Sequence, residues 1–185
     1  SFLSARIIIL YLPSLFVCIS IILLSIYFPH ALPKCSYGLQ NIITFLSQDT
    51  FLIEDTIKNN ITLSSDHNID NKKLEKAIQL ACADKFIKDL PGQLDYMVGT
   101  HGRKISSGQK QRIVIARAFY DAREILVLDE ATNAIDESTE KEIYQNIIDE
   151  KGSKTIVIVS HNKSNLSFCD NKYEIKDGSI IKLIN

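Results

Sequence analysis

The sequence lacks three features that would point to familiar classes of protein. It has no basic excess, because its formal net charge is -1, and this argues against a nucleic-acid-binding protein. Its cysteines form no CxxC pair, which argues against a disulfide scaffold or a zinc site and favours reduced thiols in a cytosolic domain. The four cysteines are Cys18, Cys35, Cys82 and Cys169. Glycine is scarce too, with only Gly38 before residue 92 and no Gly-Lys pair in the 185 residues.

The N-terminal segment, residues 1–41, contains one long apolar run. Residues 7–28 carry no charge, and this run is longer than the ~20 residues that cross a bilayer. We therefore predict a membrane-spanning helix here, with Pro13 tolerated near one end. Two alternatives stay open, a buried hydrophobic segment and a translated segment with no native role. The first residue is Ser1 rather than Met, which is compatible with a piece of a longer chain.

Residues 42–185 have the pattern of a soluble α/β domain. Continuous apolar runs of strand length alternate with stretches in which apolar residues recur at helical spacing. The predicted strands are residues 42–47, 124–128, 154–160 and a hairpin within 173–183, and the predicted helices are residues 70–90, 107–120 and 136–148. This order predicts a largely parallel sheet covered by helices on both faces.

Four polar residues follow directly after predicted strands, where parallel α/β sheets bind ligands. These residues are Gln48, Asp129, Glu130 and His161. A carboxylate at the end of a buried strand suits Mg²⁺, so Asp129 is a candidate metal ligand. Its neighbour Glu130 could accept a proton from an attacking water. Taken singly, each residue also fits an ordinary structural role, such as a solvated acid or a hydrogen-bonded histidine.

The stretch KISSGQKQR, residues 104–112, has the small residues and the helix start of a phosphate-binding loop. Its backbone N–H groups and the hydroxyl of Ser106 or Ser107 can reach phosphate oxygens, and the helix adds the positive end of its dipole. Gly108 and Gln109 complete the loop. A Ser-Ser-Gly loop is common by itself, so its assignment depends on all these elements occurring in one order.

In that order the motifs resemble the nucleotide-binding domain of ATP-binding cassette (ABC) transporters over roughly residues 42–183. FLSQDTF, DYMVGTHG, ISSGQKQRIVIARAF, ILVLDE, ATNAID and VIVSH resemble the family's Q-loop, X-loop, signature, Walker B, D-loop and switch-histidine motifs, respectively. The set implies a P-loop NTPase-like α/β fold of the exporter type, with a mostly parallel sheet and a helical signature subdomain.

The resemblance implies a role for each site residue. Asp129 and Gln48 would contact Mg²⁺, and Glu130 would be the catalytic base. His161 would contact the γ-phosphate of ATP. Nucleotide contacts are further implied for Gln48, Ser106, Ser107, Gly108, Gln109 and Asp136. Ser107 stands where the family has the first glycine of its signature.

The family's Walker A loop, GxxxxGK[ST], does not occur in these residues. That loop cradles the phosphates with its backbone, reaches them with its lysine and helps to hold Mg²⁺. The apolar run of residues 7–28 stands where the family places this loop. Because phosphoryl transfer depends on such positioning, we expect very weak ATP hydrolysis by the chain alone.

In the family two cassettes pair head to tail, and each ATP lies between Walker A of one and the signature of the other. The expected partners are therefore a second, intact cassette in a hetero-dimer and a transporter transmembrane domain. The expected cofactors are ATP and Mg²⁺. The expected function is the nucleotide-binding component of a membrane-associated exporter of lipid, lipid-linked sugar or peptide, with the cassette on the cytoplasmic side.

Two alternative functions stay open. One is a non-catalytic, membrane-anchored protein that donates its signature loop to an intact cassette. The other is a degenerate gene fragment whose N-terminal segment comes from a shifted reading frame. An ABC ATPase of the DNA-repair type is disfavoured, because no long coiled coil interrupts the domain.

Overall fold

The computed structural model describes the secondary structure of several stretches of the chain. They are residues 7–11, 42–47, 51–64, 69–121, 123–149, 154–160, 169–176 and 179–183. The chain divides into two compact units, which are described separately below. The sheet unit comprises Ser1–Phe45, Arg123–Asp129 and Gly152–Asn185, and the helical unit comprises Leu46–Ala122 and Glu130–Lys151.

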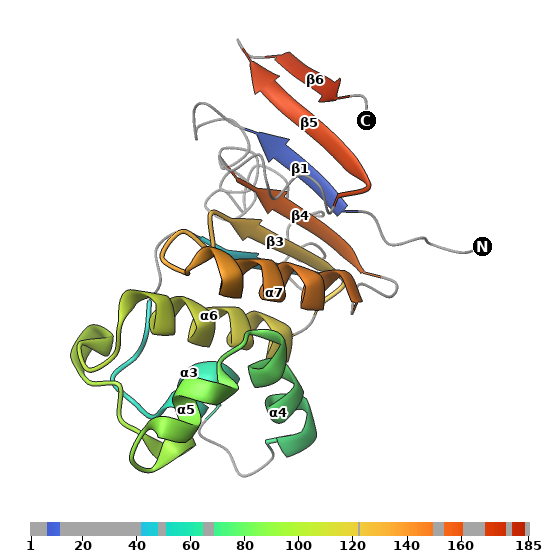
Figure 1. The fold of residues 1–185 in the computed structure, drawn as a ribbon. Coiled ribbons are helices and arrows are strands. Elements are labelled where there is room, and N and C mark those ends of the chain that lie inside the picture. Colours follow the sequence, from blue (N-terminus) through green and yellow to red (C-terminus); the bar gives the residue numbers. More distant parts are fainter. Residues whose placement is uncertain are drawn as a thin grey trace, which may run out of the picture. The chain divides into compact units, whose positions relative to one another are not determined.

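Within the described residues, the sheet has six strands in the order β2-β3-β4-β1-β5-β6 (Figure 1). Its strands are β1 Ile7–Tyr11, β2 Ile43–Leu46, β3 Ile125–Asp129, β4 Thr155–Val159, β5 Asn171–Lys176 and β6 Ser179–Leu183. Parallel pairing joins β3 to β4, β4 to β1 and β1 to β5, whereas β5 and β6 form an antiparallel pair. The predicted parallel sheet and the terminal hairpin are therefore confirmed.

Strand β1 corrects the prediction of a membrane-spanning helix over residues 7–28. Its residues are paired with β4 on one side and with β5 on the other, so the run begins as a central strand. A strand inside a parallel sheet is as apolar as a membrane helix, and isoleucine favours the extended backbone. Residues 12–28 lie outside the described residues. Within the part of the chain that the structure describes, no helix is long and apolar enough to cross a membrane.

The carboxyl ends of three parallel strands lie level with one another. Asp129 of β3 is in register with Val159 of β4, and Val159 is in register with Leu10 of β1. Parallel α/β sheets bind their ligands at this edge. Asp129, which is only 6% exposed, therefore lies where the sequence predicts a ligand of Mg²⁺.

The helical unit contains helices that precede and follow β3 in the sequence (Figure 1). Its elements are α3 Ile57–Thr62, α4 Asn71–Leu80, α5 Asp84–Asp89, the 3₁₀ turns η1 Gln93–Asp95 and η2 Thr100–Gly102, α6 Ser107–Asp121 and α7 Glu137–Asp149. Helix α6 packs against α3 and α4, and α4 also contacts α7. Isoleucines of three helices are at most 1% exposed, namely Ile57, Ile61, Ile113, Ile115, Ile143 and Ile147. The apolar stripes of these helices are thus core.

The single helix predicted over residues 70–90 is instead two helices, α4 and α5, separated by a turn at residues 81–83. Cys82 has a left-handed backbone with a φ of 51°, which no α-helix accommodates. The turn is buried, and Arg112 of α6 donates a hydrogen bond to the Cys82 carbonyl oxygen at 2.9 Å. Ile87 of α5 is buried, so the second helix also contributes to the core. The apolar spacing does not reveal the break itself, because tertiary contacts such as that of Arg112 stabilise the turn.

Candidate functional site

The signature-like loop is held by a reciprocal pair of hydrogen bonds at the start of α6. The Gln109 backbone N–H donates to Ser106 Oγ at 3.2 Å, and the Ser106 backbone N–H donates to Gln109 Oε1 at 3.0 Å. This arrangement is a capping box, which satisfies two backbone donors at the helix start. Ser107 is exposed at the first helical position. The side chains of Ser106 and Gln109 thus shape the loop, and their predicted nucleotide contacts stay a prediction.

Gly108 lies against the turn that follows β3. A Cβ atom at Gly108 would lie 2.8 Å from the carbonyl oxygen of Ala134, closer than real Cβ atoms pack. One turn further along α6, Gln111 Oε1 accepts the Ala134 backbone N–H at 2.8 Å. The helical unit therefore brings the signature-like loop together with the D-loop-like turn, residues 131–136, which we call the D-loop turn.

Glu130 stands just before this turn with an uncommon backbone. It is buried and has a φ of 49°, in the left-handed region that residues other than glycine seldom adopt. Its carboxylate oxygen Oε2 accepts a hydrogen bond from Asn133 Nδ2 at 2.7 Å. A buried carboxylate that a neighbour holds in one orientation has the directed geometry that a general base requires. The catalytic role of Glu130 stays a prediction.

Two residues anchor the D-loop turn to α7. Thr132 is buried; its hydroxyl donates to Glu140 Oε1 at 2.6 Å and lies 3.1 Å from the Tyr144 hydroxyl. Asp136 caps the helix, because its Oδ1 accepts the Thr139 backbone N–H at 3.0 Å. The prediction that Asp136 is the N-cap is confirmed.

The cap formed by Asp136 makes a pH-dependent contribution to stability. Hydrogen bonds from the Ser138 hydroxyl, at 2.6 Å, and from Thr139 hold the pKa of Asp136 well below its usual value. Because the folded pKa is depressed, the contribution is full above the unfolded pKa of about 3.9 and is lost as the pH falls through the folded pKa. We expect Asp136→Ala to lower the melting temperature at about pH 7 and to lower it less at about pH 3, as thermal denaturation would measure. Equal losses at both pH values would contradict this assignment.

The structure describes only some of the remaining predicted site residues. Asp129 ends β3 in the sheet unit, whereas Gln48 and His161 lie outside the described residues. Among the residues that are described, no three His, Cys, Asp or Glu side chains form a group that could hold a metal ion. Mg²⁺ at a nucleotide needs only one or two protein ligands, with phosphate and water oxygens as the others. Asp129 fits such an ion, and its predicted role is unchanged.

Sequence reasoning missed a half-buried tether between α6 and the segment after the Q-loop-like motif. Arg117 donates from Nε to the Asn60 carbonyl oxygen at 2.7 Å and from Nη1 to the Phe51 carbonyl oxygen at 3.2 Å. Burial lowers the pKa of the Arg117 guanidinium. The Asn60 side chain is fully buried and bonds to the backbone of Ile53 and Thr56. The only signal in the sequence is an arginine among the apolar residues of a helix.

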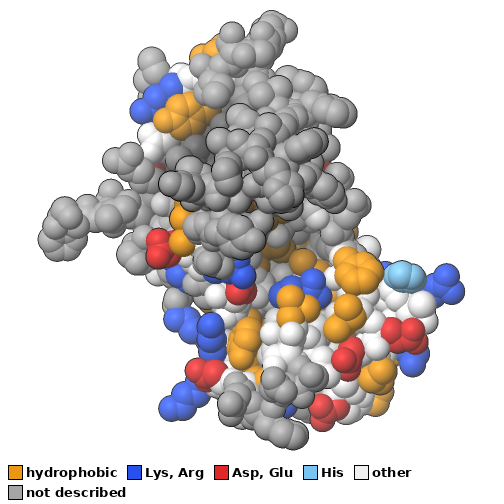
Figure 2. Space-filling model, turned by 180° about the vertical axis from the view of Figure 1, so that it is seen from behind, with side chains coloured by type: hydrophobic (Ala, Val, Ile, Leu, Met, Phe, Trp, Pro, Cys, Tyr) orange, Lys and Arg blue, Asp and Glu red, His pale blue; other side chains and the backbone are white. Residues whose placement is uncertain are grey.

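The segments around this tether expose a set of large apolar side chains. Phe51, Ile53 and Met97 are 59%, 37% and 44% exposed, respectively. Met97 forms an isolated β-bridge with Thr56, and the Phe51 ring lies edge-on to His101 with 6.2 Å between ring centroids. Figure 2 shows hydrophobic side chains beside a histidine on this face. We call Phe51, Ile53 and Met97 the apolar face.

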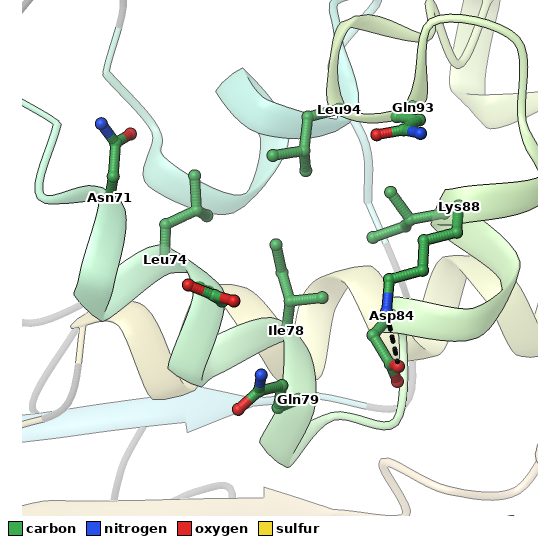
Figure 3. A pocket seen from close by; sticks show the side chains of 10 residues that line it. Asn71, Leu74, Ile78, Gln79, Asp84, Lys88, Gln93 and Leu94 are labelled. Atoms are coloured by element: carbon green, nitrogen blue, oxygen red, sulfur yellow. Dashed lines mark ion pairs between the residues drawn. The ribbon is translucent and has the colours of Figure 1, made fainter.

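The helical unit also contains a cavity of about 400 Å³ among α4, α5 and η1 (Figure 3). Leu74, Ile78 and Leu94 contribute apolar surface to it. Lys88 and Asp84 form an ion pair at its edge, 3.7 Å apart. None of the predicted site residues lines this cavity, so it does not belong to the nucleotide-related site.

Comparisons with known proteins define the class to which this fold and site belong. The family model described as ABC transporter matches residues 32–133, which is more than half of the chain. The chain therefore belongs to the ABC transporter family.

The chain is homologous to proteins described as ATP-dependent lipid A-core flippases. The flippase of Photobacterium profundum is 37% identical over 149 residues, which are 79% of this chain and 26% of the relative. That of Pseudoalteromonas translucida is 40% identical over 144 residues, 78% of this chain and 25% of the relative. The chain thus spans about a quarter of the length of these relatives.

A solved structure supports the same class. It is described as a bacterial Atm1-family ABC exporter with ATP bound, and it matches this fold with a TM-score of 0.81 at 26% identity. The match covers 94% of this chain and 32% of that chain.

Of the two parts of the family's nucleotide site, this chain has a counterpart of the signature loop but none of the Walker A phosphate cradle. Domains of the family bind and hydrolyse ATP, generally with Mg²⁺. The start of α6 fits a nucleotide phosphate, because the N–H groups of a helix's first turn, here those of Ser107 and Gly108, have no acceptor within the helix. The phosphate cradle does not fit. Central strand β1 is followed in the sequence by LPSLFVCI, which contains neither glycine nor lysine.

Proposed function

We propose that the chain is the nucleotide-binding part of an ABC exporter and that it completes a nucleotide site with a different cassette. The observation that carries the proposal is a contrast within the chain. The signature-like loop is preformed by the capping box of Ser106 and Gln109, yet no GxxxxGK[ST] sequence occurs in the 185 residues. Head-to-tail pairing with an intact cassette lets such a chain contribute its signature to phosphates that the partner holds.

The residues at the start of α6 would act by binding and orienting. ATP with Mg²⁺ supplies the phosphoryl group in this family. The backbone N–H groups of Ser107 and Gly108, with the positive end of the helix dipole, would face its phosphate oxygens. The Ser107 hydroxyl adds one donor that the family's glycine lacks. Asp129 and Glu130 keep buried positions, but without a phosphate cradle no hydrolysis step through them follows.

The apolar face supports docking to a transmembrane domain. Phe51, Ile53 and Met97 keep large apolar side chains in solvent, next to backbone that Asn60 and Arg117 hold in place. Burial of each such side chain against a partner would contribute about 1–2 kcal/mol. The chain would thereby associate with the cytoplasmic side of a membrane. Relatives described as lipid A-core flippases favour a lipid as the transported substrate.

The incomplete site predicts an inactive chain when it is alone. We expect the purified protein to hydrolyse ATP at the background rate, and we expect Glu130→Gln to change nothing, because no phosphate cradle serves this carboxylate. Phosphate release with Mg²⁺-ATP would measure both. Turnover at about 1 s⁻¹ or more that is lost in Glu130→Gln would overturn the proposal.

A complementation assay tests whether the chain completes a nucleotide site with a different cassette. The chain is mixed with the isolated cassette of the Photobacterium profundum flippase, in which the cassette's own signature serine is replaced by an arginine. That cassette retains its Walker A loop but cannot complete a site with its own copies. Any ATP hydrolysis above the sum of the two separate proteins then comes from a site that this chain completes.

One observation favours a degenerate gene fragment as a second candidate. The chain keeps the motifs from the Q-loop onward, while the residues before them match none of the family's phosphate-binding pattern. Reading the encoding DNA in all three frames upstream of residue 42 would decide. A GxxxxGK[ST] codon string in another frame would favour the degenerate fragment, and its absence would favour a chain that works with a partner.

A further inference from the structure

The side chain of Gln111 makes a buried hydrogen bond to a residue outside its own helix. It lies within α6 and is only 5% exposed. Its Oε1 accepts the backbone N–H of Ala134 at 2.8 Å. A buried amide is costly unless it is hydrogen-bonded, so this contact fixes both the side chain and the peptide that it binds.

The same residue, Ala134, is confined from a second direction. The Ala134 carbonyl oxygen lies so close to Gly108 that a Cβ atom there would approach it to 2.8 Å. Gly108 and Gln111 are three residues apart and therefore lie on one side of α6. The N–H of Ala134 and its carbonyl group thus both meet the helix that begins with the signature-like loop.

The remaining anchors of the D-loop turn lead to α7. Thr132 bonds to Glu140, and Asp136 caps α7 through the Thr139 N–H. Ala134 lies between these two anchors in the sequence. Its hydrogen bond to Gln111 therefore ties the middle of the turn to α6, while both ends are tied to α7.

We propose that Gln111 is a positioning residue that holds the D-loop turn against the signature helix, so that the two reach a partner's nucleotide as one unit. The hydrogen bond between Gln111 and the D-loop turn forms within this chain and needs no partner. Its effect on catalysis rests on the proposed function.

Amide hydrogen exchange tests the holding of the turn in the full chain. Gln111→Met keeps the length of the side chain but removes the strong acceptor, whereas Gln111→Glu keeps an acceptor. We expect the Ala134 amide to exchange at least about tenfold faster in Gln111→Met, with the Ile115 amide of α6 unchanged as an internal reference. Gln111→Glu should restore slow exchange. Unchanged Ala134 exchange in Gln111→Met, or equal acceleration in both variants, would overturn the inference.

The complementation assay tests the consequence for catalysis. We expect Gln111→Met to lower kcat about tenfold and to leave the KM for ATP within about twofold, because the partner's Walker A loop still binds the nucleotide. Gln111→Glu should recover most of kcat. An active mixture whose kcat is the same for Gln111→Met and the unsubstituted chain would overturn the positioning role. If the unsubstituted chain fails to complement, the proposed function is wrong, and hydrogen exchange alone decides the holding of the turn.

Discussion

Gly108→Ala is expected to reduce hydrolysis in the complementation assay to background and to destabilise the chain by roughly 1–2 kcal/mol. The added Cβ would lie 2.8 Å from the Ala134 carbonyl oxygen, which is a backbone atom. That oxygen cannot yield easily, because Gln111 holds the N–H of Ala134 and the N–H of the next peptide, that of Ile135, donates to the Thr132 carbonyl oxygen at 2.9 Å. Overpacking of this kind costs about 1–3 kcal/mol, and the better helix propensity of alanine returns at most about 1 kcal/mol. Either the D-loop turn or the signature-like loop must move.

Ser107→Gly is the matched control for Gly108→Ala. It changes the neighbouring residue, which is exposed, and restores the glycine that the family has at this position. Ser107→Gly should lower hydrolysis at most about threefold, because it removes the hydroxyl donor but leaves the backbone N–H groups in place. Urea denaturation would measure the stability of both variants. If Gly108→Ala complemented as well as Ser107→Gly does, the close approach of the two loops would have no role in function.

Asn60→Ala is expected to lower the free energy of unfolding by roughly 2–4 kcal/mol. The Asn60 side chain is fully buried, and its Oδ1 accepts the Ile53 N–H at 2.9 Å. Its Nδ2 donates to the carbonyl oxygens of Ile53 and Thr56, each at 3.0 Å. Alanine would leave the Ile53 N–H without its acceptor, at a cost of about 1–3 kcal/mol, and would remove one of the two hydrogen bonds that each carbonyl oxygen accepts. The segment that carries the apolar face would loosen as a result.

Asn71→Ala serves as the control for Asn60→Ala. Asn71 is an exposed residue in the first turn of α4, so its replacement should change the free energy of unfolding by less than about 0.5 kcal/mol. Chemical denaturation of the two variants gives the comparison directly. Similar values for both variants would show that the buried network around Asn60 does not hold this segment.

Much of the fold could be predicted from local patterns. The apolar runs that became β3 and β4 are continuous and of strand length, and the Asp136 cap marks the start of α7. Local patterns fail where tertiary packing decides. The apolar residues of β1 suit a membrane and the centre of a parallel sheet equally well, and only pairing with β4 and β5 separates the two. The turn at Cys82 is likewise stabilised by Arg112, thirty residues away.

The candidate site was predictable in its residue types but not in its internal contacts. The order of motifs predicts that Ser106, Gly108 and Glu130 belong to one kind of site. No spacing rule predicts that Gln111 binds the peptide of Ala134, because the two lie on separate elements. The capping box of Ser106 does follow the S-x-x-Q pattern, which the sequence carries and which its interpretation as a phosphate loop overlooked.

The most direct test of the account is the rate of ATP hydrolysis in the complementation assay. We expect background hydrolysis by the chain alone and by the signature-disabled cassette alone. The mixture should hydrolyse ATP at a clear rate that survives Glu130→Gln in this chain and disappears in Gly108→Ala. Hydrolysis by the chain alone, or a mixture that does no better than its separate parts, would contradict it.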